Sequence, residues 1–269
     1  MTTTISPEDV NRLSSFLAHE QIQIPTTTPT PPAADCIVIC VSAILDAAET
    51  VFTHLEQCPT LTKTLVLCGG IGHSTPFLYD AVARHPRFVH LAADIQGLPE
   101  ARVLHCLFTR CFDAERIQSA GCRVLVEDGS TNCGANAIFT KELLRRSGVE
   151  VGSVLVVQDP TMARRTVASF EKVFASTGTE SPRFASWPVF VPRVALQAGE
   201  LVYNVPGIPA DRLWSLPRFL GLIVGEIPRL RDDAEGYGPK GKGFIAHVDI
   251  PEEVEAAWER VKGLDMARR

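Results

Sequence analysis

The sequence predicts an α/β protein with a Rossmann-like, doubly wound and mostly parallel sheet, joined to a smaller C-terminal part. Two observations predict this fold. Short apolar runs alternate with helical segments of ten or more residues, which is typical of repeated βαβ units. The runs at 36–41 and 154–157 are apolar throughout, as strands covered by helices on both faces are. Right-handed crossovers between such strands give a layered structure.

The elements are expected in a regular order along the chain. A first helix is expected at 7–21, because Val10, Leu13, Phe16 and Leu17 share one face of it. The prolines at 25–32 exclude helix and indicate an extended linker. Strands are expected from short apolar runs at 36–41, 64–68, 88–91, 123–126, 154–157 and 184–187. Helices are expected from longer amphipathic segments at 42–57, 76–84, 100–112, 131–146, 162–174 and 251–262.

The pattern divides the chain into three parts. Residues 1–33 carry the first helix and the Pro/Thr linker, and residues 34–200 carry the Rossmann-like core. Residues 201–269 are expected to form a C-terminal subdomain packed on that core, because prolines replace the alternation there. Its Lys/Gly loop around Lys240 and Lys242 is expected either to close over a ligand or to be a solvated linker.

Composition excludes several classes of function. Of 269 residues, 45% are hydrophobic and 21% are charged, and the net charge of -5 argues against a nucleic-acid partner. No apolar run approaches the ~20 residues that span a bilayer, and we expect no signal peptide, so the chain is predicted to be cytoplasmic with no membrane partner. The eight cysteines form no C-x-x-C pair, so we expect buried thiols rather than disulfides or a metal site.

The most informative segment is a glycine-rich turn at 69–75, placed between a buried strand and a helix. Glycines let the backbone approach a ligand closely, and the start of a helix offers N–H groups to an anion. No lysine follows at the place that a Walker A loop requires. His73 is either an acid/base or phosphate donor, or a solvent-facing or capping residue. The residues of this turn expected to bind a ligand are Gly69, Gly70, Gly72, His73, Ser74 and Thr75.

A second polar loop follows the strand at 123–126. Glu127 and Asp128 end that strand, and hydroxyl and amide side chains open the next helix, with Ser130 or Thr131 as the expected N-cap. Acid-x-Gly after a strand is similar to the methyltransferase loop in which the acid binds the ribose of S-adenosylmethionine. The ligand-binding residues expected here are Asp128, Ser130, Thr131, Asn132 and Asn136.

A third polar loop follows the strand at 154–157. Asp159 lies where a carboxylate faces the crevice beyond the strand ends, which is where ligands of doubly wound sheets bind. Arg164 is expected either to clamp a phosphate or carboxylate, or to pair with Asp159. Glu100, at a helix start, adds a further carboxylate. The candidate catalytic residues are His73, Glu100, Glu127 and Asp159.

Four blocks of the sequence resemble, in order, the YdcF-like proteins, a branch of the domain-of-unknown-function family that also groups SanA and ElyC. The blocks lie at 69–75, 127–136, 157–166 and 225–251. The resemblance implies a Rossmann-like core and a nucleotide-type ligand, with S-adenosylmethionine as the candidate cofactor, held by residues that include Thr161 and Arg164. It implies no established reaction. Thr161 stands where the family has a histidine before Met162, so no mechanism through that histidine is expected.

Three functions stay open at this point. The first is an enzyme that uses S-adenosylmethionine, for instance as a transferase. Glu127, Asp159 or Glu100 would then serve as the base or as an anchor for a hydroxyl group. The second is a ligand-binding or sensory protein without turnover, because no complete catalytic constellation is present. The third is a hydrolase or transferase acting on phosphate- or sugar-bearing substrates. All three take a small-molecule ligand, and the exposed edge strands of an open sheet are compatible with a homodimer.

Overall fold

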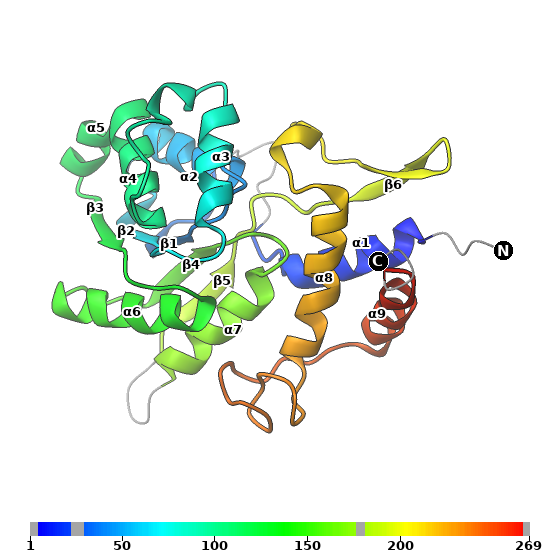
Figure 1. Ribbon diagram of the computed structural model, residues 1–269. Helices are drawn as coiled ribbons and strands as arrows, with labels where there is room; N and C mark the ends of the chain where they lie inside the picture. The colour runs from blue at the N-terminus through cyan, green and yellow to red at the C-terminus, as the bar shows by residue number, and fades with distance from the viewer. Residues whose placement is uncertain (1–4, 23–29, 176–180, 266–269) are drawn as a thin grey trace.

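A computed structural model describes residues 5–22, 30–175 and 181–265, and it confirms the α/β class. Five parallel strands form the central sheet in the order β3-β2-β1-β4-β5 (Figure 1). Chain order reverses between β1 and β4, so the switch point of the sheet lies beyond the carboxyl ends of these two strands. The strands are β1 (Ala34–Cys40), β2 (Thr62–Cys68), β3 (Arg123–Glu127), β4 (Ser153–Val157) and β5 (Arg183–Ser186).

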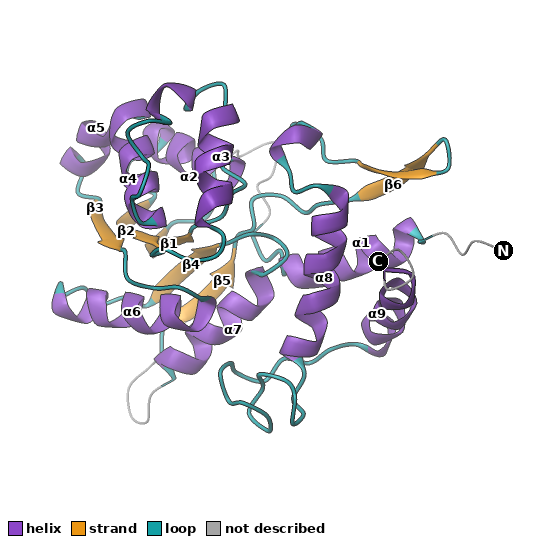
Figure 2. Cartoon of the chain, viewed as in Figure 1, coloured by secondary structure: helices purple, strands orange, loops and turns teal. Residues whose placement is uncertain are grey.

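Helices cover both faces of this sheet, as Figure 2 shows. One face carries α2 (Asp46–Gln57), α3 (Thr75–Arg84), α4 (Glu100–Cys111) and α5 (Ala114–Ser119). The other face carries α6 (Cys133–Arg146) and α7 (Ala163–Phe174). Alternate residues of β1 enter different layers, because Ile37 and Ile39 pack with the first group and Cys36 and Val38 with the second. Burial on both faces explains why the two central strands, β1 and β4, are apolar over 36–40 and 154–157.

The segment expected to be a strand at 88–91 is instead a short 3-10 helix, Val89–Leu91. Its ends are buried, with Phe88 stacked on His85 at a ring separation of 4.2 Å. Phe88 and Leu91 therefore fill the helical layer, and no strand in the described part of the chain pairs with this run. Helix α5 was not expected.

A second hydrophobic core lies beside the sheet layers (Figure 1). It joins α1 (Pro7–Ala18), α8 (Leu216–Leu230) and α9 (Glu252–Asp265), and a hairpin of β6 (Val194–Gln197) and β7 (Glu200–Tyr203) adjoins it. The expected boundary at 200/201 falls within β7. The expected first helix ends at Ala18 instead of 21, and the linker at 25–32 lies largely outside the described residues.

Helix α8 and the hairpin were not expected from the sequence. Two prolines and two glycines interrupt the helical pattern of α8, namely Pro217, Gly221, Gly225 and Pro228. The buried residues of α8 nevertheless recur at helical spacing. They are Phe219, Leu220, Ile223, Glu226, Ile227 and Leu230. Pro228 has no N–H to donate to the carbonyl of Val224, and Trp258 Nε1 of α9 donates to that carbonyl instead, at 2.8 Å.

The segment around Lys240 and Lys242 folds back on itself. Asp232 Oδ1 accepts a hydrogen bond from the backbone N–H of Lys240 at 2.5 Å, and the N–H of Tyr237 donates to the carbonyl of Arg229 at 2.9 Å. The N–H of Ala246 then donates to the carbonyl of Ala168 in α7 at 2.9 Å. These contacts hold the segment against the core.

Three further features bear on class and assembly. All eight cysteines are free thiols. Within the described ranges, no helix combines the length and the apolarity needed to cross a bilayer. The edge strands of the sheet are β3 and β5, so a homodimer through an edge strand stays a prediction.

A buried ion pair joins the two cores. Arg165 of α7 donates from Nε and Nη2 to the two carboxylate oxygens of Glu226 in α8, at 2.5 and 3.0 Å. Arg229 adds a contact of 2.7 Å to the same carboxylate, whose side chain is 1% exposed. The two-pronged geometry fixes the orientation of α8 against α7.

Glu226→Ala is expected to destabilise the protein by about 3–5 kcal/mol, because Arg165 would be left as an uncompensated buried charge. Urea denaturation monitored by far-UV circular dichroism measures the loss. Glu142→Ala is the matched control, since Glu142 pairs with the exposed Arg145 on the surface of α6. Equal effects of the two substitutions would contradict this role for Glu226.

Candidate functional site

The glycine turn after β2 packs directly against the loop after β3. The N–H of Gly69 donates to the carbonyl of Glu127 at 2.9 Å, and the N–H of Gly70 donates to the carbonyl of Ser130 at 2.6 Å. A Cβ atom on Gly70 would stand only 2.6 Å from the Ser130 oxygen and 2.9 Å from the Asp128 oxygen. Close approach of two backbones therefore requires glycine at position 70.

The same turn also receives the start of α4. The N–H groups of Glu100 and Ala101 donate to the carbonyls of Gly70 and Gly69, at 3.1 and 2.7 Å. The first donors of this helix are thereby satisfied within the protein. The turn thus organises the carboxyl end of β2 whether or not a ligand is bound.

Glu127 is buried, and its carboxylate is fully occupied by its own neighbourhood. Oε1 accepts hydrogen bonds from the N–H groups of Gly129 and Ser130, at 2.8 and 3.0 Å. Oε2 accepts from the hydroxyl of Ser130 and from the thiol of Cys68, the latter at 3.1 Å. Four donors use the acceptor positions of this carboxylate, so in this state it holds the loop and has little capacity to act as a base.

Asp159 is 1% exposed and is occupied in the same way. Oδ1 accepts from the N–H and the hydroxyl of Thr161, at 2.9 and 2.7 Å. Oδ2 accepts from Ser42 Oγ at 3.0 Å and from Trp214 Nε1 at 2.8 Å. Asp159 therefore connects the ends of β1 and β4 to the segment that covers them.

Arg164 points away from the loop ends. Its Nε donates to the carbonyl of Phe16 in α1 at 2.6 Å, and its guanidinium lies 4.0 Å from the centre of the Phe16 ring. Burial lowers the pKa of Arg164 to about 10. Neither a hydrogen bond nor an ion pair joins Arg164 to Asp159 in the described part of the chain, so the alternative in which the two residues pair is wrong. A role for Arg164 in binding a phosphate or carboxylate stays a prediction.

The other predicted residues divide between exposed and structural positions. Exposed residues at the loop ends are His73, Ser74, Thr131 and Asn132. Asn132, and neither Ser130 nor Thr131, is the N-cap of α6, because its Oδ1 accepts from the N–H of Ala135 at 3.0 Å. Asp128 accepts from Arg102 Nε at 2.7 Å. Asn136 is buried in the first turns of α6, and Gly72 would bring a Cβ atom to 3.7 Å from the Thr131 oxygen.

Glu100 differs from the other predicted carboxylates. Its Oε1 accepts a hydrogen bond from Thr75 Oγ1 at 2.8 Å, and Thr75 in turn accepts from the N–H of Gly72 at 2.8 Å. Partial burial raises the pKa of Glu100, and the Thr75 hydrogen bond opposes that rise. The Glu100 carboxylate can therefore accept further hydrogen bonds, whereas the carboxylates of Glu127 and Asp159 are already occupied.

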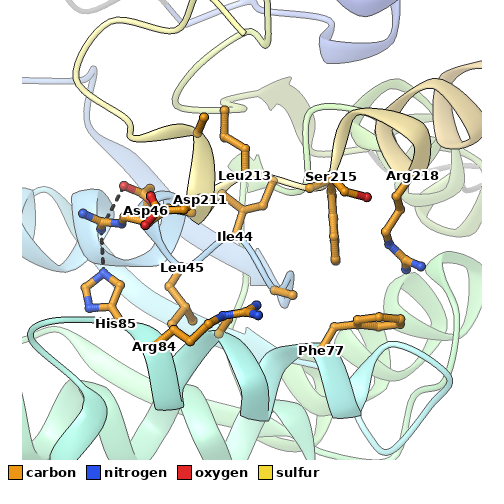
Figure 3. Close-up of a pocket in the computed structure, with 15 residues that line it drawn as sticks. Ile44, Leu45, Asp46, Phe77, Arg84, His85, Asp211, Leu213, Ser215 and Arg218 are labelled. Carbon is orange, nitrogen blue, oxygen red and sulfur yellow. Dashed lines mark hydrogen bonds and ion pairs between the residues drawn. The ribbon is translucent and has the colours of Figure 1, made fainter. Parts of the chain in front are cut away.

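A cavity of about 440 Å³ opens beside these loops, between the start of α2, helix α3 and the segment 210–218 (Figure 3). The volume is that of an ordinary small-molecule site. Ionisable side chains line all three sides. They are Asp46, Arg84, His85, Asp211, Arg212 and Arg218.

Arg218 forms an aromatic-cation wall of the cavity. Its guanidinium lies 4.0 Å from the centre of the Phe77 ring and 4.4 Å from that of Trp214. Figure 3 shows Arg218 and Arg84 directed toward the space above Phe77. The hydrogen bond from Trp214 to Asp159 holds this wall against the end of β4.

Arg212 forms the opposite wall through an ion network. Its Nη2 is 2.9 Å from Asp46 Oδ1, 2.9 Å from Glu49 Oε2 and 2.5 Å from His85 Nε2. Burial raises the pKa of Asp46, and the charge of Arg212 opposes this rise. Burial, followed by the charge of Arg212, lowers the pKa of His85.

Unsatisfied polar atoms are concentrated at this cavity. Among the described residues, four buried side-chain atoms have no hydrogen-bond partner: Asp46 Oδ2, Arg212 Nε, Arg218 Nε and His54 Nδ1. Three of the four belong to residues that line the cavity. Buried polar atoms without partners are rare in proteins and call for a physical reason. A ligand that supplies the partners is such a reason.

Sequence reasoning placed the site at the strand ends and missed this cavity. Its walls come from 43–46, 77–85 and 210–218, which are far apart in the chain. One feature pointed to the last of these segments, because Arg212, Trp214 and Arg218 bring two cations and an aromatic ring together within seven residues. In the ranges that the structure describes, no group of three or more His, Cys, Asp or Glu side chains could hold a metal ion.

No known protein-family model matches this chain.

Gly70→Ala is expected to destabilise the protein by about 1–3 kcal/mol, because the added methyl group meets two backbone oxygens that cannot easily move. Gly263→Ala is the control. This glycine lies in α9 with no atom within 4 Å of an added Cβ, so alanine is expected to stabilise the helix by about 0.5–1 kcal/mol. Urea denaturation midpoints measure both changes, and a neutral Gly70→Ala would show that the two loops can separate.

Glu100→Gln is expected to stabilise the protein at neutral pH and to have little effect at acidic pH. The raised pKa of Glu100 means that the folded state loses stability as pH rises through that pKa, whereas glutamine stays neutral and still accepts the Thr75 hydrogen bond. Thermal midpoints measured from pH 4 to 7 should separate progressively. Glu115→Gln, at an exposed position in α5, provides the control. Parallel pH profiles for Glu100→Gln and wild type would refute the effect.

Proposed function

We propose that this protein binds an anionic small molecule of the nucleotide type in the cavity between α2, α3 and 210–218. One observation carries the proposal. Arg84 and Arg218 both line the cavity, and neither has an acidic partner in the described part of the chain. Guanidinium groups bind phosphate and carboxylate oxygens through paired N–H donors.

The charge of the lining supports an anion over a cation. Three arginines face two aspartates, and one of these aspartates, Asp46, is already paired with Arg212. A phosphate group would supply acceptors for Arg84 and for the open Nε of Arg218. The aromatic rings of Phe77 and Trp214 favour a ligand that also has an apolar or planar part.

The proposal is for binding without turnover. Glu127 and Asp159, the two buried candidate bases, have their acceptor positions occupied by neighbouring donors. Glu100 retains capacity, but it is not among the residues that line the cavity. A role in binding or sensing therefore accounts for more of the observations than a transferase or hydrolase does.

S-adenosylmethionine is a second candidate ligand, at the exposed strand-end loops. The four-block resemblance to the YdcF-like proteins supports this proposal. We propose membership of that family on the same residues. The short distance between Gly72 and the Thr131 carbonyl supports it too, since it brings the exposed residues of both loops to one edge of the sheet. The sulfonium cation of this compound suits the arginine-lined cavity less well than a phosphate does.

Arg84→Ala and Arg218→Ala are each expected to weaken the binding of adenosine monophosphate at least tenfold, because a charge-assisted contact to phosphate is lost. Calorimetric titration of the full chain measures this, with inorganic phosphate, adenosine triphosphate and S-adenosylmethionine as further ligands. Arg145→Ala, on the exposed face of α6, should leave the affinity unchanged.

Thermal midpoints of the three arginine variants control for folding. The absence of binding by wild type to any phosphate compound would refute the proposed function. Saturable binding of S-adenosylmethionine that is unaffected by Arg84→Ala would favour the second candidate.

A further inference from the structure

We infer that the ligand carries a hydroxyl group beside its anionic group, and that Asp46 is the residue that recognises this hydroxyl. The inference rests on the proposed function and narrows its ligand to a phosphorylated sugar, either free or as part of a nucleotide. It starts from the distribution of open hydrogen-bond positions on the wall formed by Asp46 and Arg212.

Asp46 is held in place but only half satisfied. It is the first residue of α2, it is 8% exposed, and its Oδ1 is 2.9 Å from Arg212 Nη2. Its Oδ2 is buried and has no hydrogen-bond partner among the residues that the structure describes. A carboxylate oxygen removed from water loses free energy unless a donor replaces the water, so this oxygen requires a donor from elsewhere.

Arg212, the residue paired with Asp46, has an unused hydrogen-bond donor. Arg212 Nε is a buried donor that has no acceptor among the described residues. The Nη2 atom of the same guanidinium contacts Asp46, Glu49 and His85. One ion pair thus presents an open acceptor and an open donor. A hydroxyl group can donate and accept at once, whereas phosphate and carboxylate anions only accept. A sugar hydroxyl therefore suits this wall better than a second anionic group.

The other acids near this wall do not have the same vacancy. Both carboxylate oxygens of Glu49 are engaged, Oε1 by Arg87 at 3.4 Å and Oε2 by Arg212 at 2.9 Å. Asp211 also lines the cavity, but it is exposed and can be satisfied by water. Asp46 is consequently the acid to which a bound ligand would supply the missing hydrogen-bond donor. Arg84 and Arg218 remain for the phosphate.

The test compares adenosine monophosphate with its 2′,3′-dideoxy analogue by calorimetric titration of the full chain. Wild type is expected to bind the hydroxylated compound at least tenfold more tightly. Asp46→Ala and Asp46→Leu should reduce this ratio of affinities to about twofold or less while retaining phosphate binding, because neither side chain can bond a hydroxyl. Asp211→Asn, at the exposed acid of the same cavity, should keep the wild-type ratio.

Each outcome decides a different question. Equal binding of both compounds by wild type would overturn the role of Asp46 and leave the proposed function standing. An unchanged ratio of affinities in Asp46→Ala or Asp46→Leu, with folding judged by the thermal midpoint, would also overturn the role of Asp46. Failure of every phosphate compound to bind wild type would overturn the proposed function and this inference together. Ribose 5-phosphate distinguishes a free phosphorylated sugar from a nucleotide as the ligand. If it binds as tightly as adenosine monophosphate, the sugar phosphate alone is sufficient for binding and the base is not recognised.

Discussion

The cavity has its shape because the carboxylate of Asp159 holds three parts of the chain at one point. Ser42 after β1, Thr161 after β4 and Trp214 of the covering segment all donate to it. None of these donors can be exchanged freely for water, since Asp159 is almost completely buried. Trp214, once held there, supplies a ring beneath Arg218. A residue outside the cavity thereby determines the position of the cavity wall.

This arrangement gives a physical account of why the most conspicuous sequence motifs are not the cavity lining. The acids and glycines at the strand ends satisfy one another, and in doing so they bring the loops into fixed positions. The arginines that remain open come from α3 and 210–218, which rest on those loops. A ligand loses less binding free energy to the ordering of side chains when the donors are already held in place than when they must first be ordered.

Periodicity predicted the core because both faces of its sheet are buried. The strand and helix positions from 34 to 187 follow from this pattern with two exceptions. At 88–91, Phe88 and Leu91 fill a helical layer, and helix α5 was not expected. In α8, apolar spacing was obscured by Pro217, Gly221, Gly225 and Pro228. For the candidate site, residue type alone does not separate a carboxylate that binds a ligand from one satisfied two or three residues away, as Glu127 is. The cavity was not predictable, because only tertiary contacts join its three walls.

The packing of α1 against α9 has a consequence for biosynthesis. Val10, Leu13 and Leu17 of α1 are buried in the second core, whose other members include Val254 and Trp258 of α9. Residues 19–251 separate the two helices, and at about 5–20 residues per second a ribosome needs roughly 10–50 s to make that stretch. During this interval α1 can contact α7 and α8, but the part of its apolar face that packs on α9 lacks its native neighbour. The second core is therefore complete only after the last helix has been made, although the sheet that precedes it in the chain already has all five of its strands.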